Sequence, residues 1–557
     1  MSLRYRDNAD TLNRRIAVEA VGESALMVLR RLVTVVLAAA AAHPAAAAAA
    51  APAPFGSLVC TPQEGVRFCQ GRVPTFDDVP IDLNVTLPAN GDGNFPLIIL
   101  SHGWGGSKFP LVSANDRGNL QGSSLPWAQR GFAVLSISSR GFSGSCGSLP
   151  SRAAVGCERG WLRLDDTRFE VRDVQDLAGR LVDDGLVDPA KIGVHGGSYG
   201  GGVSNALAML RNRIMNQDGS YGPWQSPNGR PISLAASAPY IPWSDLVYSL
   251  TPNGRTLDYV PPTPTDSREP KGVMKQSFTA GLYALGNTTG FYAPPGVDPD
   301  ADLTSWFARI GAGEPYDGDP VITDIADEIY THHSSIAIDR SVPPPPIFSA
   351  SGWTDDLFPV EESLRLRNAV LERWPDTPYA LMFWDTGHQR GSNRRPDRDR
   401  YQRYLAAWME RYVKGDTSVQ TLTGVETLTQ TCPKDAPTGG PFRAPSWPEL
   451  RRGEVRFGAP AAQSVTNAGG DPDKARAIDP IAGGGDACAS VSESDEPGTV
   501  NYRLPAATGN GYTLMGSPTI LADIATTGAN PQLNARLWDV APDGKQTLVA
   551  RTVYRPA

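Results

Sequence analysis

The chain has 557 residues, of which 40% are hydrophobic and 20% are charged. This composition is typical of a globular protein of two or three domains with a large core. The formal net charge of −8 is modest for this length, so we expect no nucleic acid partner.

Residues 1–54 have the features of a bacterial-type export signal. A pair of arginines precedes Leu32–Ala42, a short and mostly apolar run, and an Ala/Pro-rich tract follows it. A basic region, a short apolar segment and a small-residue cleavage zone are typical of a secretory signal, and the run is too short to span a membrane. We expect a secreted protein without a stable membrane span, with translation starting at Met27 in place of Met1. A membrane anchor, a disordered arm and a twin-arginine signal are the alternatives.

Six cysteines agree with export, because disulfides persist in oxidising compartments. Six cysteines allow 15 pairings, and pairing of neighbours along the chain is the simplest, because short loops close easily. These neighbours are Cys60 with Cys69, Cys146 with Cys157, and Cys432 with Cys488. No CxxC motif or Cys/His cluster suggests zinc, and we expect neither a metal nor another cofactor.

Strand and helix patterns alternate between residues 55 and 415. Ile81–Leu87 alternates between apolar and polar residues, which is typical of an antiparallel strand with one exposed face. Continuous apolar runs, which suit strands buried on both faces of a parallel sheet, are Pro96–Leu100, Phe132–Ile137, Ile192–Val194, Ile232–Leu234, Ile347–Ala350 and Ala380–Trp384. Phe169–Leu177 and Tyr401–Val413 have helical patterns. The alternation predicts an α/β domain with right-handed crossovers and a mainly parallel sheet.

Two intervals break this rhythm. Residues of about 240–340 are rich in proline and aromatic residues, and we expect a lid over the strand ends, because long insertions in compact domains are usually functional. A surface loop with its own small core is the alternative. Residues 416–557 are rich in Gly, Pro and Thr and contain β-type runs, which predict an all-β sandwich of jelly-roll type. These runs are Val500–Leu504, Leu533–Val540 and Leu548–Tyr554.

The sequence Gly196-Gly197-Ser198-Tyr199-Gly200 fits the pattern G-x-S-x-G. It follows a predicted strand and precedes small residues that can begin a helix. A serine at such a turn is held exposed above the sheet edge, where a base and a substrate can reach it. We interpret Ser198 as the nucleophile of an α/β-hydrolase; an ordinary serine in a glycine-rich turn is the alternative.

Two further polar residues follow predicted strands in the chain order serine, acid, histidine that is typical of this fold. Asp355 comes after Ile347–Ala350, and His388 comes after Ala380–Trp384. The carboxyl ends of parallel strands meet at one edge of a sheet. We therefore expect Ser198, His388 and Asp355 to form a catalytic triad.

Other residues compete for these roles. Asp356 could replace Asp355 as the acid, but we expect it to cap the helix that follows it. We expect His195, His332 and His333 to be packed or hydrogen-bonded side chains.

The oxyanion formed on the substrate needs two hydrogen-bond donors. One is expected to be the backbone N–H of Tyr199, the residue after the nucleophile. The other is expected from the loop Ser101-His102-Gly103-Trp104-Gly105-Gly106, with Trp104 as the best single residue. Packing of Trp104 under the lid is the alternative.

Several stretches resemble the Xaa-Pro dipeptidyl-peptidase and cocaine-esterase family of serine hydrolases over about residues 75–555. They are Arg140–Ser145, Gly196–Gly201, Gly352–Asp355, Gly387-His388 and Leu537–Gly544. The resemblance implies an α/β-hydrolase domain with a helical cap, followed by a C-terminal jelly-roll sandwich. It also implies hydrolysis of esters or amides, including release of Xaa-Pro dipeptides in some members.

The chain departs from this family at two places. Family members often supply an oxyanion donor from a tyrosine hydroxyl where this chain has Trp104, so here a backbone N–H must serve. The chain also stops at Ala557, directly after a predicted strand, whereas the family's sandwich usually continues. A truncated sandwich is therefore an alternative. We therefore expect a signal or disordered region at 1–54, an α/β-hydrolase domain at 55–415 with its cap at about 240–340, and a β-sandwich at 416–557.

These observations predict a secreted serine hydrolase that cleaves an ester or amide through an acyl-enzyme on Ser198, and we favour acyl esters. An Xaa-Pro dipeptidyl-peptidase is the alternative. It would need a carboxylate for the substrate's amino group, for which Glu158, Asp165 and Asp166 are candidates. A binding protein on an inactive hydrolase scaffold is the alternative from another class. The expected partner is a small ester or a short peptide.

Overall fold

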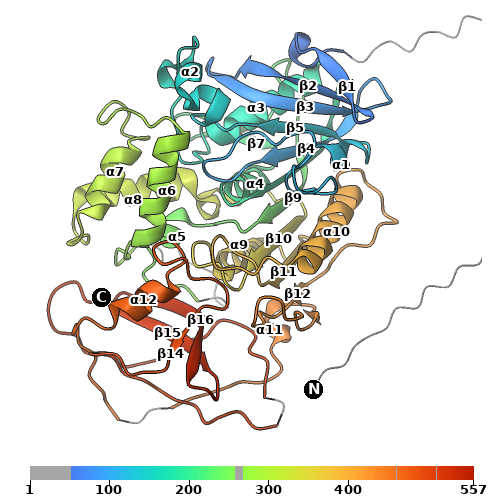
Figure 1. The fold of residues 1–557 in the computed structure, drawn as a ribbon. Helices are drawn as coiled ribbons and strands as arrows, with labels where there is room; N and C mark the ends of the chain where they lie inside the picture. The colour runs from blue at the N-terminus through green and yellow to red at the C-terminus, as the bar shows by residue number, and fades with distance from the viewer. Residues whose placement is uncertain (1–51, 258–267, 459–460, 510, 557) are drawn as a thin grey trace, which may run out of the picture. The chain divides into compact units, whose positions relative to one another are not determined.

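A computed structural model describes residues 52–257, 268–458, 461–509 and 511–556 (Figure 1). Residues 1–51, which hold the predicted export signal, and 258–267, which belong to the predicted cap, lie outside the described residues. Residues 49–557 form one compact unit.

A large mixed sheet forms the centre of this unit. Seven neighbouring strands, from β5 to β12, run parallel, and antiparallel strands extend the sheet at both edges. In spatial order the strands are β1 (Cys60–Gln63), β2 (Val66–Pro74), β3 (Pro80–Pro88), β5 (Ala133–Ile137), β4 (Phe95–Ser101), β6 (Val187–Gly197), β9 (Leu234–Tyr240), β10 (Ile347–Gly352), β11 (Tyr379–Trp384), β12 (Val425–Thr427) and β13 (Phe442–Ala444).

Helices cover both faces of the sheet, which explains the continuous apolar runs. In β4, Leu97 and Ile99 join a core with α3, α4 and α9, whereas Ile98 and Leu100 join a core with α1 and α10 on the other face. The helices of these two layers are α1 (Leu125–Ala128), α3 (Glu170–Asp183), α4 (Tyr199–Leu210), α9 (Val360–Arg373) and α10 (Arg395–Tyr412). The short elements α2 (Leu149–Arg152), β7 (Arg213–Met215) and β8 (Tyr221–Pro223) lie in connections between them.

The strands predicted between residues 55 and 415 are present, with one shift. The exposed face expected for Ile81–Leu87 is wrong: Asn84 and Thr86 of β3 are buried, and they donate to the carbonyl oxygen of Phe109 and to the hydroxyl of Ser124. The run predicted at Ile232–Leu234 becomes β9, which begins at Leu234 and continues to Tyr240. Its central residues are small, and Ala236 and Ala238 are fully buried beneath the flanking helices. Small side chains fit that space but do not make a strongly apolar run, so the sequence pattern understated the strand.

A group of helices is inserted between β9 and β10. They are α5 (Leu246–Leu250), α6 (Gln276–Thr289), α7 (Leu303–Gly311) and α8 (Pro320–His333), in the green part of the ribbon in Figure 1. Apolar residues of these helices share one core with Tyr199 at the start of α4 and with Phe358 before α9. The insertion therefore covers the end of the sheet at which β6 and β10 finish.

The C-terminal residues contain a three-stranded antiparallel sheet within the described part of the chain. Its order is β14 (Ser490–Ser492), β16 (Lys545–Tyr554) and β15 (Leu533–Val540), and the short helices α11 (Trp447–Leu450) and α12 (Pro472–Ile478) precede it. The strand predicted at Val500–Leu504 is wrong: this run is irregular and mostly exposed, and no strand of the described residues pairs with it. Asn501 and Arg503 donate instead to the nearby Asp495. The jelly-roll sandwich and the division at residue 415 stay predictions.

Three disulfides join Cys60 to Cys69, Cys146 to Cys157, and Cys432 to Cys488. The predicted neighbour pairing is confirmed. The first crosses β1 and β2, where the two cysteines face each other in the register.

Candidate active site

Ser198 lies in a sharp turn between β6, which ends at Gly197, and α4, which begins at Tyr199. Its backbone has φ 57° and ψ −116°, a strained conformation for a residue with a side chain. The Ser198 N–H donates to the carbonyl oxygen of Tyr240 (3.0 Å), which fixes the turn to the end of β9. A Cβ on Gly200 would lie 2.1 Å from the carbonyl oxygen of Ser101, so only glycine fits there.

The three residues of the predicted triad lie in one hydrogen-bonded chain. The Nε2 atom of His388 is 2.7 Å from the Ser198 hydroxyl oxygen, and its Nδ1 atom is 2.7 Å from Oδ2 of Asp355. The other carboxylate oxygen of Asp355 accepts the backbone N–H groups of Leu357 (3.0 Å) and Phe358 (2.9 Å). Asp355 is therefore buried, fully hydrogen-bonded and oriented toward the imidazole, as a group that fixes the histidine tautomer needs to be.

Asp356 does not cap the following helix, so that expectation is wrong. Helix α9 begins at Val360, with Pro359 as its N-cap and no side-chain cap. The carboxylate of Asp356 instead forms ion pairs with Arg390 (3.0 Å) and Arg551 (2.9 Å). Two guanidinium groups that lie far from Asp356 in the sequence compete for it better than the local backbone does.

The other histidines are packed or hydrogen-bonded, as predicted. His195 bonds through Nδ1 to the carbonyl oxygen of Ala238 (2.7 Å), and burial lowers its pKa to about 4. His333 bonds through Nδ1 to the carbonyl oxygen of Leu164 (2.8 Å), and His332 lies beside a glutamate of its own helix. None of these rings contacts Ser198 in the hydrogen bonds of the described residues.

Tyr199 and Trp104, the two predicted oxyanion donors, both lie beside Ser198. The Tyr199 N–H is at the first turn of α4, where backbone donors have no partner within the helix. The loop with Trp104 passes close to the serine, because a Cβ on Gly103 would lie 3.7 Å from the Cβ of Ser198. The indole N–H of Trp104 donates to the carbonyl oxygen of Leu282 in α6 (2.9 Å), so only its backbone N–H is left for a substrate.

The sequence analysis gave no role to His102, which orients this loop. Its Nδ1 atom is 2.7 Å from the carbonyl oxygen of Gly103, which also accepts the N–H of Gly106 (3.0 Å). Its Nε2 atom accepts the N–H of Ser139 (2.8 Å), and burial lowers its pKa to about 4, so the ring is neutral. Because a trans peptide points C=O and N–H in opposite directions, fixing the Gly103 oxygen also fixes the Trp104 N–H.

Glu170 is a second residue that the sequence analysis missed, since its place in an amphipathic helix gave no signal. Its carboxyl accepts the backbone N–H groups of Arg163 (2.7 Å) and Asp166 (2.9 Å), and the Tyr199 hydroxyl lies 3.3 Å away. Burial and the nearby Asp166 raise the pKa of Glu170 to about 7. This carboxyl group supports the side chain of Tyr199 directly behind the nucleophile turn.

Ser198 opens into a cavity of about 170 Å³ beneath the inserted helices. Its lining is almost wholly apolar or aromatic, and within the described residues Lys271 is the one charged side chain that lines it. The Nζ atom of Lys271 is already bound to Glu269 and to the carbonyl oxygen of Arg268. The inserted helices contribute several of the lining residues, including Leu246, Leu282, Trp306, Ile325, Ala326 and Ile329.

Residues 77–216 match the family model of the X-Pro dipeptidyl-peptidases (S15 family). The chain is a serine hydrolase. Over these residues the match confirms the resemblance drawn from the sequence. It includes Trp104, Ser198 and Tyr199, and it does not extend to Asp355 or His388.

Solved structures of esterases and peptidases are similar to this hydrolase over part of its length. An acetyl xylan esterase from Paenibacillus sp. R4 is 18% identical with a TM-score of 0.36, over 63% of this chain and 88% of that one. An acetyl xylan esterase from a Thermoanaerobacterium species is 14% identical (TM-score 0.36), over 65% of this chain and 94% of that one. A puromycin-hydrolyzing peptidase from Mycobacterium tuberculosis is 16% identical (TM-score 0.36), over 63% of this chain and 40% of that one.

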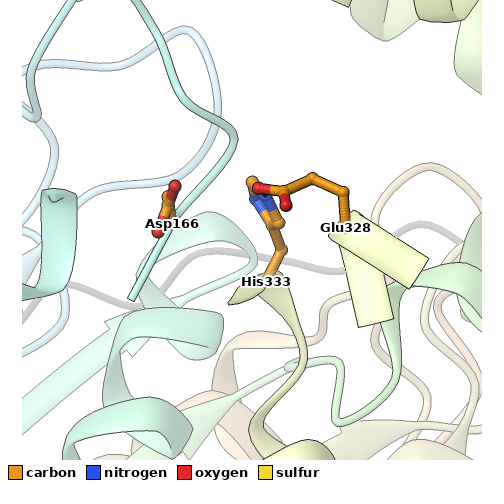
Figure 2. A group of neighbouring side chains, drawn as sticks. All are labelled: Asp166, Glu328 and His333. Atoms are coloured by element: carbon orange, nitrogen blue, oxygen red, sulfur yellow. Dashed lines mark ion pairs between the residues drawn. The ribbon is translucent and has the colours of Figure 1, made fainter. Parts of the chain in front are cut away.

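One cluster of the hydrolase has side chains of the kinds that bind metals. Ligand atoms of Asp166, Glu328 and His333 lie within 4.8 Å of one another (Figure 2). However, the guanidinium of Arg168 donates to Asp166 (2.7 Å) and also to Glu328. An arginine therefore already supplies the positive charge that these carboxylates need, and it joins the loop before α3 to the inserted helix α8.

No helix in the described residues of the hydrolase is long and apolar enough to cross a membrane. Its three disulfides are typical of proteins from oxidising compartments.

Proposed function

We propose that this protein is an esterase that transfers an apolar acyl group from an ester to Ser198 and then to water. The observation that carries the proposal is the hydrogen-bonded chain Ser198–His388–Asp355, in which Ser198 lines an apolar cavity. A buried apolar lining favours substrates with apolar groups, because moving such groups from water into the cavity lowers the free energy.

In the proposed mechanism, His388 accepts the proton of Ser198 as the serine oxygen attacks the ester carbonyl. Asp355 holds the imidazole in the tautomer that can accept this proton and stabilises the imidazolium that forms. The backbone N–H groups of Tyr199 and Trp104 donate to the oxyanion, each worth roughly 2.7–4 kcal/mol of barrier. His388 then protonates the leaving alcohol, and water, with His388 again as base, releases the acid.

The family match on residues 77–216 favours a second candidate, an Xaa-Pro dipeptidyl-peptidase. Such an enzyme must bind the free amino group of its substrate, and a carboxylate in the site is the natural partner. Glu158 is exposed, Asp166 is paired with Arg168, and neither of them nor Asp165 lines the cavity. These contacts support the ester over the dipeptide.

Export is also part of the proposal. The disulfides support an oxidising environment, and residues 1–54 are the proposed signal and N-terminal region. We propose an α/β-hydrolase domain that starts at about residue 55, is capped by the helices between β9 and β10, and extends beyond the expected boundary at 415 to include β12 and β13 of the central sheet. We propose that the residues after β13 form the jelly-roll domain.

The test compares p-nitrophenyl butyrate with Gly-Pro-p-nitroanilide, for the full chain and for two variants. Ser198→Ala is expected to lower kcat by a factor on the order of 10⁶, as loss of the nucleophile does in subtilisin. Ser305→Ala, at an exposed serine of α7 that does not line the cavity, is the matched control and is expected to keep full activity.

Three results decide among the candidates. Faster turnover of the butyrate, lost in Ser198→Ala, supports the esterase. Dominant anilide cleavage would establish the peptidase. Absence of fluorophosphonate labelling in both the wild type and Ser305→Ala would refute the proposed acyl-enzyme on Ser198.

A further inference from the structure

Asp356 belongs to one of two loops that must keep a fixed distance for the proposed triad to work, and its carboxylate contacts the other loop. The acid loop, residues 353–359, follows β10 and carries Asp355; the histidine loop, residues 385–394, follows β11 and carries His388. The Asp355–His388 hydrogen bond joins the two loops at one point only, so other contacts must set their spacing.

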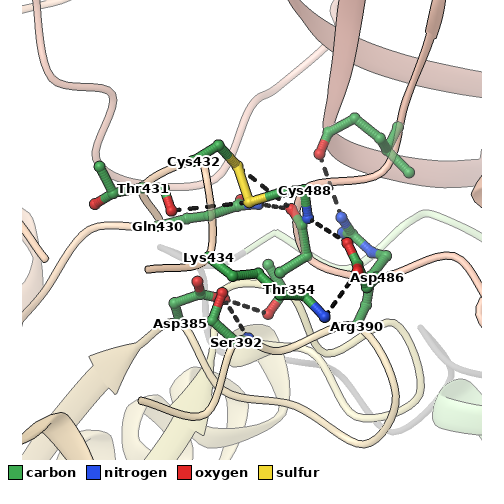
Figure 3. The surroundings of a disulfide bond; sticks show 12 residues. Thr354, Asp385, Arg390, Ser392, Gln430, Thr431, Cys432, Lys434, Asp486 and Cys488 are labelled. Atoms are coloured by element: carbon green, nitrogen blue, oxygen red, sulfur yellow. Dashed lines mark hydrogen bonds and ion pairs between the residues drawn. A yellow bond between two sulfur atoms is a disulfide. The ribbon is translucent and has the colours of Figure 1, made fainter. Parts of the chain in front are cut away.

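Residues on both sides of Asp355 tie these loops together. Before it, the Thr354 hydroxyl lies 3.1 Å from Oδ1 of Asp385 and 3.1 Å from the carbonyl oxygen of Thr386. After it, Asp356 accepts two hydrogen bonds from Arg390, at 3.0 Å from Nε and 3.2 Å from Nη2. Figure 3 shows Thr354, Asp385 and Arg390 close together, at the junction where the acid loop meets the histidine loop.

The tie at Asp356 also includes the C-terminal sheet, which belongs to the same compact unit. Arg551 of β16 forms an ion pair with the same carboxylate at 2.9 Å. Arg390 donates through Nη1 to the carbonyl oxygen of Leu548, also in β16 (3.2 Å). Arg390 is only 2% exposed, and the carboxylate of Asp356 is 10% exposed. Charges this well shielded hold a fixed geometry, because breaking one contact leaves another buried charge unpaired.

The inserted helices contact the same loop from another side. Lys275, the N-cap residue of α6, donates through Nζ to the backbone carbonyl oxygens of Asp356 and Leu357, both at 2.8 Å. Asp356 is therefore the point at which the acid loop, the histidine loop, the cap and β16 meet.

A disulfide anchors the C-terminal residues beside this junction. Cys432–Cys488 joins the segment after β12 to the segment before β14 (Figure 3). Arg394, at the end of the histidine loop, donates to the carbonyl oxygens of Thr431 and of Lys434 (2.9 Å). The histidine loop is thus attached to the C-terminal residues at both Arg390 and Arg394.

We propose that Asp356 is a positioning residue for the reaction of Ser198. In this proposal Arg551 holds Asp356 in place, and the C-terminal sheet thereby helps to position the triad. This inference rests on the proposed function. Neither residue contacts the substrate in this proposal; both act through the spacing of Asp355 and His388. A stabilising ion pair with no effect on the chemistry is the alternative.

The test uses a matched pair of arginines. Arg551 and Arg536 are directly opposite each other on β16 and β15, with side chains 26% and 24% exposed. Arg536 pairs with Glu496 and does not reach the acid loop. Arg551→Ala and Arg536→Ala therefore each remove an arginine that forms one close ion pair on the same sheet, and only the pair of Arg551 with Asp356 bears on the triad. Arg551 also has a longer contact with Asp479, at 3.9 Å.

The measurements are kcat and KM for p-nitrophenyl butyrate, the rate of fluorophosphonate labelling of Ser198, and Tm. Arg551→Ala is expected to lower kcat and the labelling rate about tenfold or more, since small misplacements of reacting groups cost up to about 100-fold. KM should stay within about twofold of wild type, and Arg536→Ala should match the loss in Tm without the loss in kcat. Arg551→Lys should recover most of kcat, because the contact with Asp356 is an ion pair through one guanidinium nitrogen, which an ammonium can also form.

The proposal is overturned if Arg551→Ala and Arg536→Ala have the same kcat and labelling rate, or if Arg551→Lys is as impaired as Arg551→Ala. If Arg551→Ala does not fold, Arg551→Gln takes its place with Arg536→Gln as its control, and equal kcat and labelling rates in these two variants would overturn the proposal. A wild-type protein without turnover or labelling would instead refute the proposed function. The two failures are thus distinguishable.

Discussion

The cavity beside Ser198 predicts how turnover depends on the length of the acyl chain. Burying one methylene group is worth about 0.8 kcal/mol, which is about a fourfold gain in kcat/KM. Four added methylenes, from acetate to hexanoate, should therefore raise kcat/KM by about 200-fold if all are buried. The cavity of about 170 Å³ has room for them, since one water needs only about 10–15 Å³ of such volume.

The perturbation is Ala326→Phe, which puts a ring into the cavity from α8. It should remove most of the gain for p-nitrophenyl hexanoate and leave p-nitrophenyl acetate within about threefold of wild type, because a short acyl group does not reach the filled space. Ala284→Phe, at an exposed position of α6 that does not line the cavity, is the control. The assay is kcat/KM for the acetate, butyrate and hexanoate esters. A wild-type profile that is flat across the series, or an equal effect of both variants, would refute the assignment of this cavity to the acyl group.

Three further predictions concern the triad, a buried acid and a disulfide. Asp355→Asn should lower kcat by roughly 10⁴ with little change in Tm, because the amide supports the wrong imidazole tautomer; steady-state kinetics check this, and a loss below tenfold contradicts it. Burial raises the pKa of Glu170 from 4.5 to about 7, so the folded state binds this proton more tightly than the unfolded state does. The protonated carboxyl therefore contributes to the free energy of unfolding in full below about pH 4.5, and this contribution is lost as the pH rises through about 7. The loss is about 3 kcal/mol at 1.36 kcal/mol per pKa unit; urea unfolding across this range should show it in the wild type and not in Glu170→Gln, and equal pH dependence in both would be evidence against it. Replacing Cys432 and Cys488 by serine should cost about 4 kcal/mol, and replacing Cys60 and Cys69 about 3 kcal/mol, because their sequence separations are 56 and 9 residues; urea unfolding of the two double variants measures the difference, and the reverse order would contradict the loop-entropy argument.

The sequence predicted the features that depend on local pattern and chain order. Apolar runs bounded by polar residues predicted the central strands, and the order of Ser198, Asp355 and His388 at strand ends predicted which side chains would meet. Both follow from parallel strands, which bring residues far apart in the chain to the same edge.

The sequence did not predict contacts that depend on distant partners. Asp356 looks like a helix cap because acidic residues follow it, but Arg551 and Arg390 bind it from elsewhere in the chain. The sequence also gave no sign that His102 would bind the carbonyl oxygen of Gly103. The orientation of the ring depends on the N–H of Ser139, which lies 37 residues away in the sequence. Val500–Leu504 has the composition of a strand, but within the part of the chain that the structure describes no other strand pairs with it.

The central sheet also limits how the molecule can be divided. Its strands β12 and β13 come from the chain after α10, and β12 bonds along β11, the strand that leads to His388. A fragment cut just after α10 would expose the backbone of β11 as a bare apolar edge, which invites pairing between molecules. Limited proteolysis should therefore yield no monomeric active core ending near residue 415, and the smallest stable fragment must retain residues up to Ala444.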